Sequence, residues 1–413
     1  MRILHLLGTV NLPRNPDKDP ASGIVRAALE TARIQARDGH RITIAASGSH
    51  RWSALWEGVT LLSLPEWKWA KITVRGRTLD LRKHAAFIWL TLTHKYHVIH
   101  SHNYGYLRFL KSPHKVMHFH ADPLAKDFSA AVWKPEDFAT VKGTASHVVA
   151  VSQFIKKQLV AAMGLDTVVS VVPNGVHLDA FSSSRLAGER AKVRTNLHIP
   201  PDAVVFLYCG AINRVKGVLN LAHAFQEVAK VSVHAYLVIA GSSSLWGGNH
   251  VGDPYESEVQ NILAVPEVDG RVKFTGLLGH DNLPALYQAA DVVVVPSLTE
   301  AFGMSALEAM ASGKPVIASN TGGLPELIRP ENGILIEPGN VQDLVAAMMV
   351  LIQSPTTRNH LGSNGRHAAQ HMTWASAGRI MRDVYAAMGR RGRAHGGNDR
   401  LQNLPESQGG DLS

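Results

Sequence analysis

The sequence predicts two α/β domains, each built on a doubly wound parallel sheet with helices on both faces. A length of 413 residues favours two or three domains. Apolar runs rich in β-branched residues alternate with helical stretches along the chain, which is typical of βαβ units. Runs such as residues 291–295 (DVVVV) show no polar alternation, so they suit strands that are covered on both faces. A composition of 45% hydrophobic and 18% charged residues supports full cores.

Composition also limits the protein class. The single cysteine, Cys209, excludes an internal disulfide framework and favours a reducing compartment. The apolar run around His5 is too short for a signal peptide, and no later window stays apolar for a membrane span. We therefore expect a cytoplasmic protein. A net charge of +9 and a pI near 9.6 favour anionic partners, but without a zinc-finger or RNP signature we expect no nucleic acid.

The first domain is expected to span residues 1–185. Its predicted strands are residues 3–7, 42–45, 98–101, 116–119 and 148–151. Gly23 lies between the first two strands, where a helix begins and backbone N–H groups can cradle a pyrophosphate. Neither G-x-G-x-x-G nor a P-loop is present, so ordinary turn chemistry is the alternative for Gly23.

Histidines cluster in the same domain, in His100-Ser-His102 and around His118 and His120. His118, His120 and Asp122 alternate, which places them on one face of a strand and suggests a metal site. The set lacks a completing ligand with suitable spacing, and 22 histidines make chance clusters common. We expect no metal here.

Residues 67–84 interleave basic residues with tryptophans and aliphatic residues. Basic amphipathic segments of this kind rest on anionic lipid surfaces. A solvated basic surface and an acceptor-facing loop are equally open interpretations. The membrane interpretation predicts a peripheral protein on the inner face of the membrane.

The second domain is expected over residues 186–373. A strand at 203–209 leads into a loop with Arg214 and Lys216 beside glycines at a helix start. A helix N-terminus, a compact ammonium and a planar guanidinium together suit a diphosphate, although a basic loop without a ligand is the alternative. Further strands are expected at residues 235–240, 272–278, 291–295, 315–318 and 333–336, and a helix at 341–352.

The stretch after the strand at 291–295 carries two carboxylates, Glu300 and Glu308, eight residues apart around Phe302-Gly303-Met304. In open α/β sheets, ligands bind outside the carboxyl ends of the strands, where a helix N-terminus offers free N–H groups. The plainer alternative is a capping box from Ser305 to Glu308 that only closes the helix start.

These residues, followed by Thr321-Gly-Gly-Leu-Pro-Glu326, resemble the E-x7-E region of retaining nucleotide-sugar glycosyltransferases of family 4. The resemblance covers residues 1 to about 388. It implies the GT-B fold, in which two Rossmann-like domains face a central cleft, the first binding the acceptor and the second the donor. It also implies a helix at 374–388 that crosses back to the first domain, and we expect residues 389–413 to be disordered.

The implied activity is transfer of a hexose-type sugar from a UDP or GDP sugar, with retention of anomeric configuration, in polysaccharide or glycolipid biosynthesis. The acceptor would be a glycan, a lipid-linked molecule or a small molecule, and neither a metal nor another cofactor is expected. His120 would orient the transferred sugar, and Glu300 would face its hydroxyls. These two are the expected catalytic residues.

In the implied donor site, cations neutralise the leaving diphosphate, a carboxylate binds the ribose hydroxyls and backbone groups contact the base. Its expected members are Gly23, Arg214, Lys216, Leu278, Phe302, Gly303, Met304 and Glu308. The sequence departs from the family at Ser22, where a second glycine is usual, and at Ala211, where an arginine is usual. Two other functions stay open: a non-catalytic glycosyltransferase-like binding or coat protein, and a nucleotide-sugar epimerase on the same fold.

Overall fold

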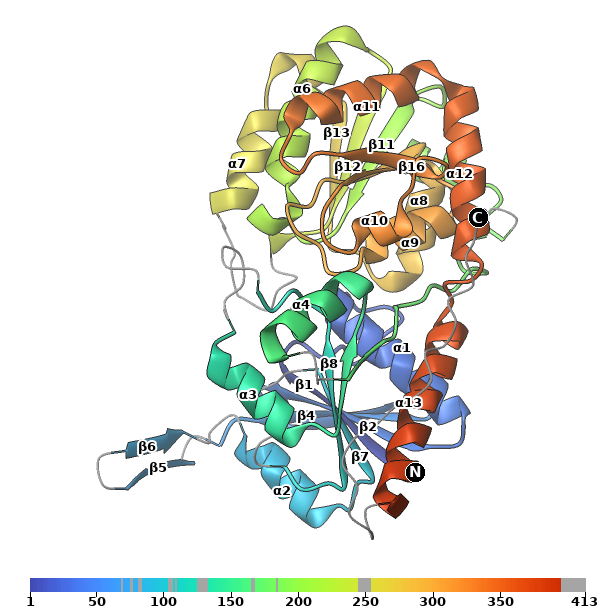
Figure 1. The fold of residues 1–413 in the computed structure, drawn as a ribbon. Helices are drawn as coiled ribbons and strands as arrows, with labels where there is room; N and C mark the ends of the chain where they lie inside the picture. The colour runs from blue at the N-terminus through green and yellow to red at the C-terminus, as the bar shows by residue number, and fades with distance from the viewer. Residues whose placement is uncertain are drawn as a thin grey trace.

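Two parallel-sheet units form the molecule, and Figure 1 shows them one above the other. The computed structural model describes residues 1–67, 70–74, 77–80, 84–102, 107, 110–124, 133–164, 168–182, 185–243 and 254–394. Each sheet is covered by helices on both faces, because its central strands are apolar on both faces. The predicted fold class is confirmed.

The first sheet has eight strands in the order β10-β9-β8-β7-β1-β2-β4-β3. All neighbours pair in parallel except β3, which runs antiparallel to β4 at the edge. The five predicted strands are present, whereas β3, β4 and β10 were not predicted. The strands are β1 (Arg2–Thr9), β2 (Arg41–Gly48), β3 (Trp52–Trp56), β4 (Val59–Pro65), β7 (Val98–Ser101), β8 (His114–Phe119), β9 (His147–Ala150) and β10 (Val169–Val171). The helices are α1 (Gly23–Arg37), α2 (Ala85–Thr93), α3 (Pro135–Thr144) and α4 (Gln153–Met163).

The second sheet has six parallel strands in the order β13-β12-β11-β14-β15-β16. All of its predicted strands are present: β11 (Val204–Cys209), β12 (Ala235–Ala240), β13 (Val272–Gly276), β14 (Val292–Val295), β15 (Val316–Ser319) and β16 (Gly333–Ile336). Its helices are α5 (Glu189–Asn196), α6 (Val218–Val231), α7 (Pro254–Leu263), α8 (Leu283–Ala289), α9 (Met304–Ala311), α10 (Leu324–Leu327), α11 (Val341–Gln353) and α12 (Pro355–Ala369). The proposed boundary at residue 185 stays a prediction, although Arg190 and Arg194 of α5 both pair with Asp291 beside β14.

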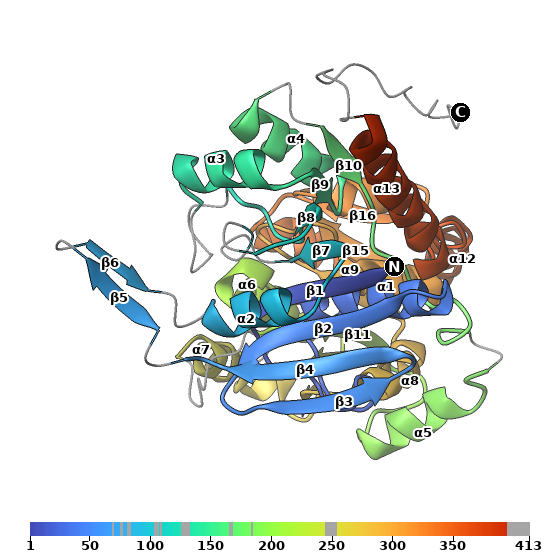
Figure 2. The ribbon, with the colours of Figure 1, turned by 90° about the horizontal axis from the view of Figure 1, so that it is seen from below.

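Helix α13 (Trp374–Ala394) leaves the second unit and packs along α1 of the first (Figures 1 and 2). Arg382 of α13 pairs with Asp38 at 2.7 Å, and the Gln35 amide donates to the Tyr385 hydroxyl at 3.1 Å. The helix continues to Ala394, so the prediction of disorder from residue 389 is wrong for residues 389–394. The helical backbone runs through the basic, glycine-containing residues 389–394, whose composition resembles a solvated tail. Residues 395–413 lie outside the described residues.

Strands β5 (Lys71–Val74) and β6 (Arg77–Asp80) form a hairpin that projects away from the body in both views (Figures 1 and 2). The predicted basic stretch 67–84 falls largely on this hairpin, and residues 68, 69, 75, 76 and 81–83 lie outside the described residues. Within the described part of the chain, every helix is too short or too polar to cross a membrane.

Candidate active site

Lys216 and Glu300 meet at the point where the strand order of the second sheet reverses. The neighbours β11 and β14 are the two strands at this reversal, and their carboxyl ends lead into the loops that carry the two residues. Lys216 Nζ lies 2.7 Å from Glu300 Oε2, and Ser297 Oγ donates to the same oxygen at 3.3 Å. The side chains are 23% and 13% exposed, so the pair stays in reach of a ligand.

Two glycines let the backbones of these loops approach closely. Gly217 adopts a φ of +65°, and a Cβ there would lie 2.0 Å from the carbonyl oxygen of Pro296. Gly322, with a φ of +60°, would place a Cβ 1.8 Å from the carbonyl oxygen of Glu300. Any side chain at either position would push the loops apart. Gly217 therefore lets the Lys216 loop approach the loop after β14, and Gly322 lets the loop after β15 approach Glu300.

Glu308 is buried inside the second unit, on α9. Tyr287 donates its hydroxyl to Glu308 Oε2 at 2.9 Å. Burial raises the pKa of Glu308 to about 7, although the hydrogen bond from Tyr287 and the charge of Arg26 act to lower it. Helix α9 begins at Met304 with Gly303 as its N-cap, so a capping box from Ser305 to Glu308 is excluded.

Four other residues of the expected donor site lie where α9 begins and where β13 ends. Phe302 is buried, and Met304 packs against the cores of both units. Gly303 has a φ of +106°, and a Cβ there would lie 2.7 Å from Leu324 Cδ2. Leu278 follows β13 and is partly buried. These four residues shape the backbone where α9 starts and β13 ends.

Arg214 and Gly23 stand apart from the ion pair. The guanidinium of Arg214 lies over the ring of Tyr255, 5.4 Å from its centroid, and not against Glu300. Gly23 is the first residue of α1, and a Cβ there would meet nothing within 4 Å. Open space at the start of α1 leaves room for a ligand beside its free N–H groups.

The two units are in contact around the site. Glu326 accepts the backbone N–H groups of Gln153 and Phe154 at 2.9 and 2.7 Å, and so caps α4 from the opposite unit. Ser152 Oγ donates to the carbonyl oxygen of Ala301 at 2.6 Å. A Cβ on Gly279 would lie 2.0 Å from the carbonyl oxygen of Lys18. The two units therefore touch at Ala301, the neighbour of Glu300, and also at Glu326 and Gly279.

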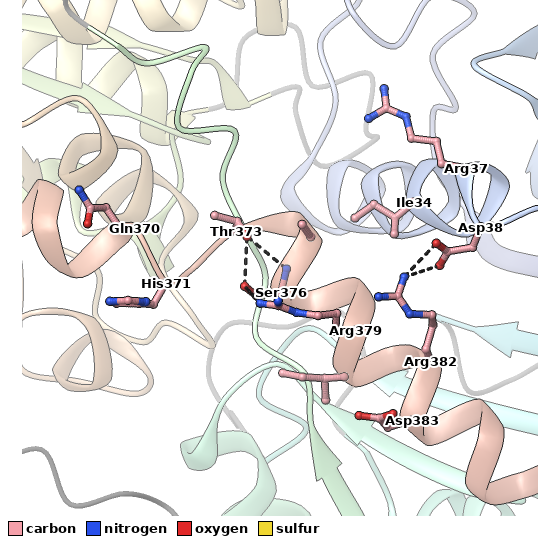
Figure 3. A pocket seen from close by; sticks show the side chains of 12 residues that line it. Ile34, Arg37, Asp38, Gln370, His371, Thr373, Ser376, Arg379, Arg382 and Asp383 are labelled. Atoms are coloured by element: carbon pink, nitrogen blue, oxygen red, sulfur yellow. Dashed lines mark hydrogen bonds and ion pairs between the residues drawn. The ribbon is translucent and has the colours of Figure 1, made fainter.

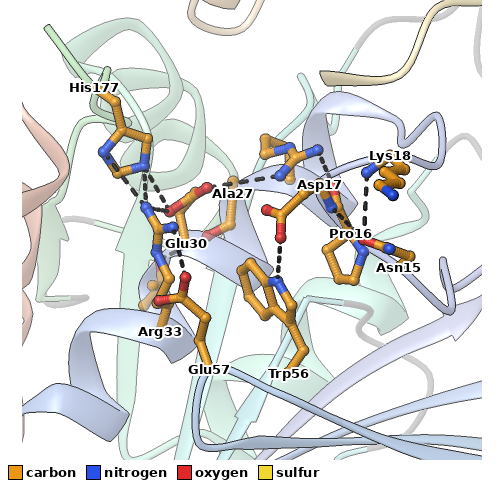
Figure 4. Close-up of polar contacts among 12 residues, drawn as sticks. Asn15, Pro16, Asp17, Lys18, Ala27, Glu30, Arg33, Trp56, Glu57 and His177 are labelled. Carbon is orange, nitrogen blue, oxygen red and sulfur yellow. Dashed lines mark hydrogen bonds and ion pairs between the residues drawn. The ribbon is translucent and has the colours of Figure 1, made fainter. Parts of the chain in front are cut away.

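A second charged cluster lies along α1 on the first unit (Figure 4). The carboxylate oxygens of Glu30 lie 2.8 Å from Nη2 of Arg33, 2.8 Å from Nε2 of His177 and 3.6 Å from Nη1 of Arg26. Burial would raise the pKa of Glu30, but the hydrogen bond from His177 and the charges of Arg33 and Arg26 outweigh burial and lower the pKa. Nη1 of Arg26 is buried and has no hydrogen-bond partner in the described part of the chain, and the charge of Arg26 acts on Glu308 across the interface. Arg26 was not predicted, since nothing in its sequence setting marks it.

Histidines from three adjacent strands stack at the carboxyl edge of the first sheet. His5 lies on β1, His100 and His102 on and after β7, and His118 and His120 on and after β8. His100 and His102 stack with centroids 4.6 Å apart, and His118 and His120 lie 4.1 Å apart. We call these five residues the histidine cluster. Asp122, predicted to share their face, instead accepts the N–H of Leu124 at 2.9 Å.

Burial keeps the histidine cluster neutral. It lowers the pKa of His5 to about 4 and that of His120 to about 3, and it lowers the pKa of the other three well below the usual value. Two triplets, His5–His100–His102 and His102–His118–His120, bring one nitrogen each within 4.8 Å, close enough to hold a metal ion. Both triplets need His102, whose two nitrogens already bond to His5 and His120. The absence of a metal stays a prediction.

Sequence comparisons cover both units. The family described as Glycosyltransferase Family 4 matches residues 21–180, and Glycosyl transferases group 1 matches residues 189–368. The chain belongs to this glycosyltransferase family. A D-inositol 3-phosphate glycosyltransferase of Streptomyces bingchenggensis is 32% identical over 310 residues, 70% of this chain and 66% of that protein. A protein of the same name from Corynebacterium kroppenstedtii is 32% identical over 56% of this chain and 51% of its own length.

Solved structures share the GT-B fold with this family 4 chain. Sucrose-phosphate synthase from Thermosynechococcus elongatus has a TM-score of 0.77 at 21% identity, covering 95% of this chain and 100% of its own. Anabaena HepE in complex with UDP-glucose has a TM-score of 0.74 at 20% identity, covering 94% and 100%. WaaG, a glycosyltransferase involved in lipopolysaccharide biosynthesis, has a TM-score of 0.71 at 17% identity, covering 93% and 99%.

A large open pocket of about 1000 Å³ lies elsewhere, between α1 and the start of α13 (Figure 3). Two of its charged side chains, Arg382 and Asp38, pair with each other at 2.7 Å. Arg379 donates to the Ser376 hydroxyl at 3.0 Å. This pocket contains none of the expected family 4 site residues, and we assign the active site to the ion pair instead.

Proposed function

We propose that the protein transfers a hexose-type sugar from a UDP or GDP sugar to a glycan, lipid-linked or small-molecule acceptor, with retention at the anomeric carbon. The observation that supports this most strongly is the Lys216–Glu300 pair at the strand-order reversal of the second sheet. Anionic ligands bind at such reversals because helix N-termini and loop N–H groups converge there. The pair adds one cation and one carboxylate to that environment.

The two members of the pair have complementary roles in this proposal. The Lys216 ammonium neutralises the diphosphate as it leaves, and preorganised charge of this kind lowers the barrier. Glu300 is freed from Lys216 when the diphosphate arrives and accepts hydroxyls of the sugar. The two carboxylates of this site are not assigned as an acid–nucleophile pair, because Glu308 is buried and bonded to Tyr287. The departing phosphate receives the acceptor's proton.

The other site residues complete the donor position. The Glu308 carboxylate accepts the two hydroxyls of the ribose, a role that suits its two oxygens. The backbone at Leu278 contacts the base. Phe302, Gly303 and Met304 bring the start of α9 to the sugar. His120 orients the sugar from the first unit.

The acceptor is expected on the first unit, beside a membrane surface. The β5–β6 hairpin projects from this unit, and the sequence from 67 to 84 is basic. On the adjoining helix α2, Trp89 is 39% exposed and Leu92 58% exposed, and Trp67 packs beside Trp89 with ring centroids 6.4 Å apart. Exposed aromatic and aliphatic groups beside basic residues favour an anionic lipid surface. Binding to vesicles with and without anionic lipid tests this part.

A donor screen tests the proposal directly. The purified protein is incubated with UDP-glucose, GDP-mannose and ADP-glucose, and release of the free nucleoside diphosphate is measured. With water as the acceptor, we expect hydrolysis of one donor, its loss in Lys216→Ala, and α-configured free hexose from an α-configured donor, read by proton NMR before the sugar mutarotates. An inverted product would refute retention. Conversion of the nucleotide sugar without nucleotide release would instead indicate an epimerase, and binding without turnover a non-catalytic protein.

A further inference from the structure

Two series of hydrogen bonds meet at the side chain of Gln35, on α1. In the first, the Gln35 amide oxygen lies 2.7 Å from Nε2 of His5, and Nδ1 of His5 lies 3.0 Å from Nε2 of His102. Nδ1 of His102 then lies 2.7 Å from Nε2 of His120. We call this the Gln35 series. It runs through buried rings and ends at His120.

The second series starts from the same amide and passes through α13. The Gln35 amide nitrogen donates to the Tyr385 hydroxyl oxygen at 3.1 Å, and that oxygen lies 2.6 Å from Nδ1 of His100. Nε2 of His100 lies 3.1 Å from Nδ1 of His118. We call this the Tyr385 series. It ends at His118.

The two end atoms are buried and, among the residues that the structure describes, have no hydrogen-bond partner. They are Nδ1 of His120 and Nε2 of His118, both of which are enclosed by the protein. The two rings lie side by side, with centroids 4.1 Å apart. Leaving a buried polar atom unpaired is unfavourable, so a group that bonds to both atoms is favoured.

The polarity of the Gln35 series follows from the chemistry of neutral imidazole, which has one N–H donor and one bare acceptor nitrogen. The Gln35 oxygen can only accept, so His5 donates through Nε2 and accepts at Nδ1. His102 must then donate through Nε2 to His5 and accept at its own Nδ1. By the same reasoning, His120 donates through Nε2 to Nδ1 of His102. The series therefore ends in a bare, accepting Nδ1 on His120.

The Tyr385 series has the opposite polarity at its end. The Tyr385 oxygen accepts from the Gln35 amide, so its hydroxyl proton is donated to Nδ1 of His100. His100 in turn donates through Nε2 to His118. The series ends in an N–H donor at Nε2 of His118.

This opposition does not depend on which way the Gln35 amide is oriented. Amide orientation and histidine tautomers are assigned from the network of hydrogen bonds. If the amide turns over, every link in both series reverses, so His120 ends in a donor and His118 in a bare acceptor. In both arrangements one end donates and the other accepts. All five rings carry their proton on Nε2 in the first arrangement and on Nδ1 in the second.

We infer that His118 and His120 together form a binding position for one hydroxyl group, which donates to one ring and accepts from the other, with Gln35 and Tyr385 as positioning residues that hold the two ends opposite in polarity. A hydroxyl has both capacities. A phosphate dianion can only accept, and an ammonium can only donate, so each leaves one ring unpaired. Identifying the group as a hydroxyl of the transferred sugar rests on the proposed function. A water molecule has the same chemistry.

Histidine tautomers are the first test, because they are measured without any substrate. In protein carrying ¹⁵N-histidine, the ring-nitrogen shifts separate protonated from bare nitrogens. At about pH 5.5, one unit below the ordinary histidine pKa, exposed rings are charged while the cluster stays neutral. Burial also lowers the pKa of His280, to about 4, and that of His40, so both rings are removed by His280→Gln and His40→Gln. We expect five neutral rings with one shared tautomer. Rings of both tautomers would overturn the two series.

Tyr385→Phe tests the positioning role. Without the hydroxyl, the two series are no longer tied together, and we expect both tautomers to appear among the five rings. Tyr96→Phe is the matched control, because Tyr96 is a buried tyrosine of the first unit outside the cluster. A Tyr385→Phe protein that keeps one shared tautomer and its melting temperature would overturn the role of Tyr385.

The ligand is tested by adding UDP-glucose or GDP-mannose and, separately, UDP or GDP. A sugar hydroxyl should move the end-nitrogen signals of His118 and His120 with the sugar nucleotide and not with the nucleotide alone. If the sugar nucleotide binds and these signals stay in place, the position holds water, and the sugar assignment is wrong. If none of the four ligands binds, the proposed function fails, while the tautomer result still decides the two series.

Discussion

The carboxyl edges of the two sheets carry polar groups of different kinds. At the edge of the second sheet, Lys216 and Glu300 form an ion pair whose side chains are 23% and 13% exposed. At the edge of the first sheet, His5, His100 and His118 are at most 2% exposed and neutral. Burying ions costs several kcal/mol each, whereas neutral rings can be buried when they bond to one another. The charged edge suits a phosphate, and the neutral edge suits directional bonds to hydroxyls.

The largest effect should come from the charged edge. We expect Lys216→Ala and Glu300→Gln each to lower kcat/KM for the nucleotide sugar by about 10²–10³-fold, which corresponds to roughly 3–4 kcal/mol. Lys230→Ala is the matched control, because Lys230 also pairs with a glutamate at 2.7 Å but on an exposed helix surface. Equal activity of Lys216→Ala and Lys230→Ala would show that the pair has no role in turnover.

The neutral edge should make the protein sensitive to acid. Because the folded pKa of His5 is about 4, against 6.5 in the unfolded chain, its contribution to stability is present above pH 6.5 and is lost as the pH falls towards 4. The loss is on the order of 3 kcal/mol for this ring. We expect the melting temperature of the parent to fall between about pH 6.5 and pH 4, and that of His5→Gln to fall less. Parallel curves would show that His5 is not buried neutral.

Glu308 should have the opposite pH dependence. Its folded pKa of about 7 exceeds the ordinary value of 4.5, so its contribution to stability is present below pH 4.5 and is lost as the pH rises through 7. The cost above that range is about 3 kcal/mol. We expect Glu308→Gln to gain melting temperature relative to the parent as the pH rises, with a plateau above about pH 7. A pH-independent difference would contradict the raised pKa.

The smallest effect is expected at the contact between the two units. Glu326 caps α4 across the interface, and Glu326→Ala removes two charge-assisted hydrogen bonds worth about 1–2 kcal/mol. Small-angle scattering should show a larger radius of gyration for this variant. Glu331→Ala, a change at an exposed glutamate of the same unit, should leave the radius unchanged. Identical radii for both variants would show that Glu326 does not hold the units together.

The sequence predicted the sheets well because their strands are short, apolar and bounded by glycines or polar residues. The run at residues 291–295 became β14 with only its first residue lost. β3 was missed because its half-buried pattern at the sheet edge mixes exposed Leu55 with buried Trp56. The end of α13 was misplaced because its basic and glycine-containing last turns resemble a solvated tail.

The site was predictable only where neighbours in sequence are neighbours in space. Glu300 and Glu308 lie on one loop and helix, yet the burial that raises the pKa of Glu308 comes from the packing of α9 and Tyr287. The bond between Lys216 and Glu300 joins loops 84 residues apart. Gln35 and Tyr385 are 350 residues apart, so no local pattern could place them together.

The most direct test of the central claim is calorimetric titration of the parent, Lys216→Ala and Lys230→Ala with UDP, GDP and ADP. If the Lys216–Glu300 pair receives the diphosphate, one nucleotide should bind the parent and Lys230→Ala equally, and its affinity for Lys216→Ala should fall at least tenfold, or about 1.4 kcal/mol. Equal binding by all three proteins, or binding by none, would contradict the assignment of the donor diphosphate to this edge of the second sheet.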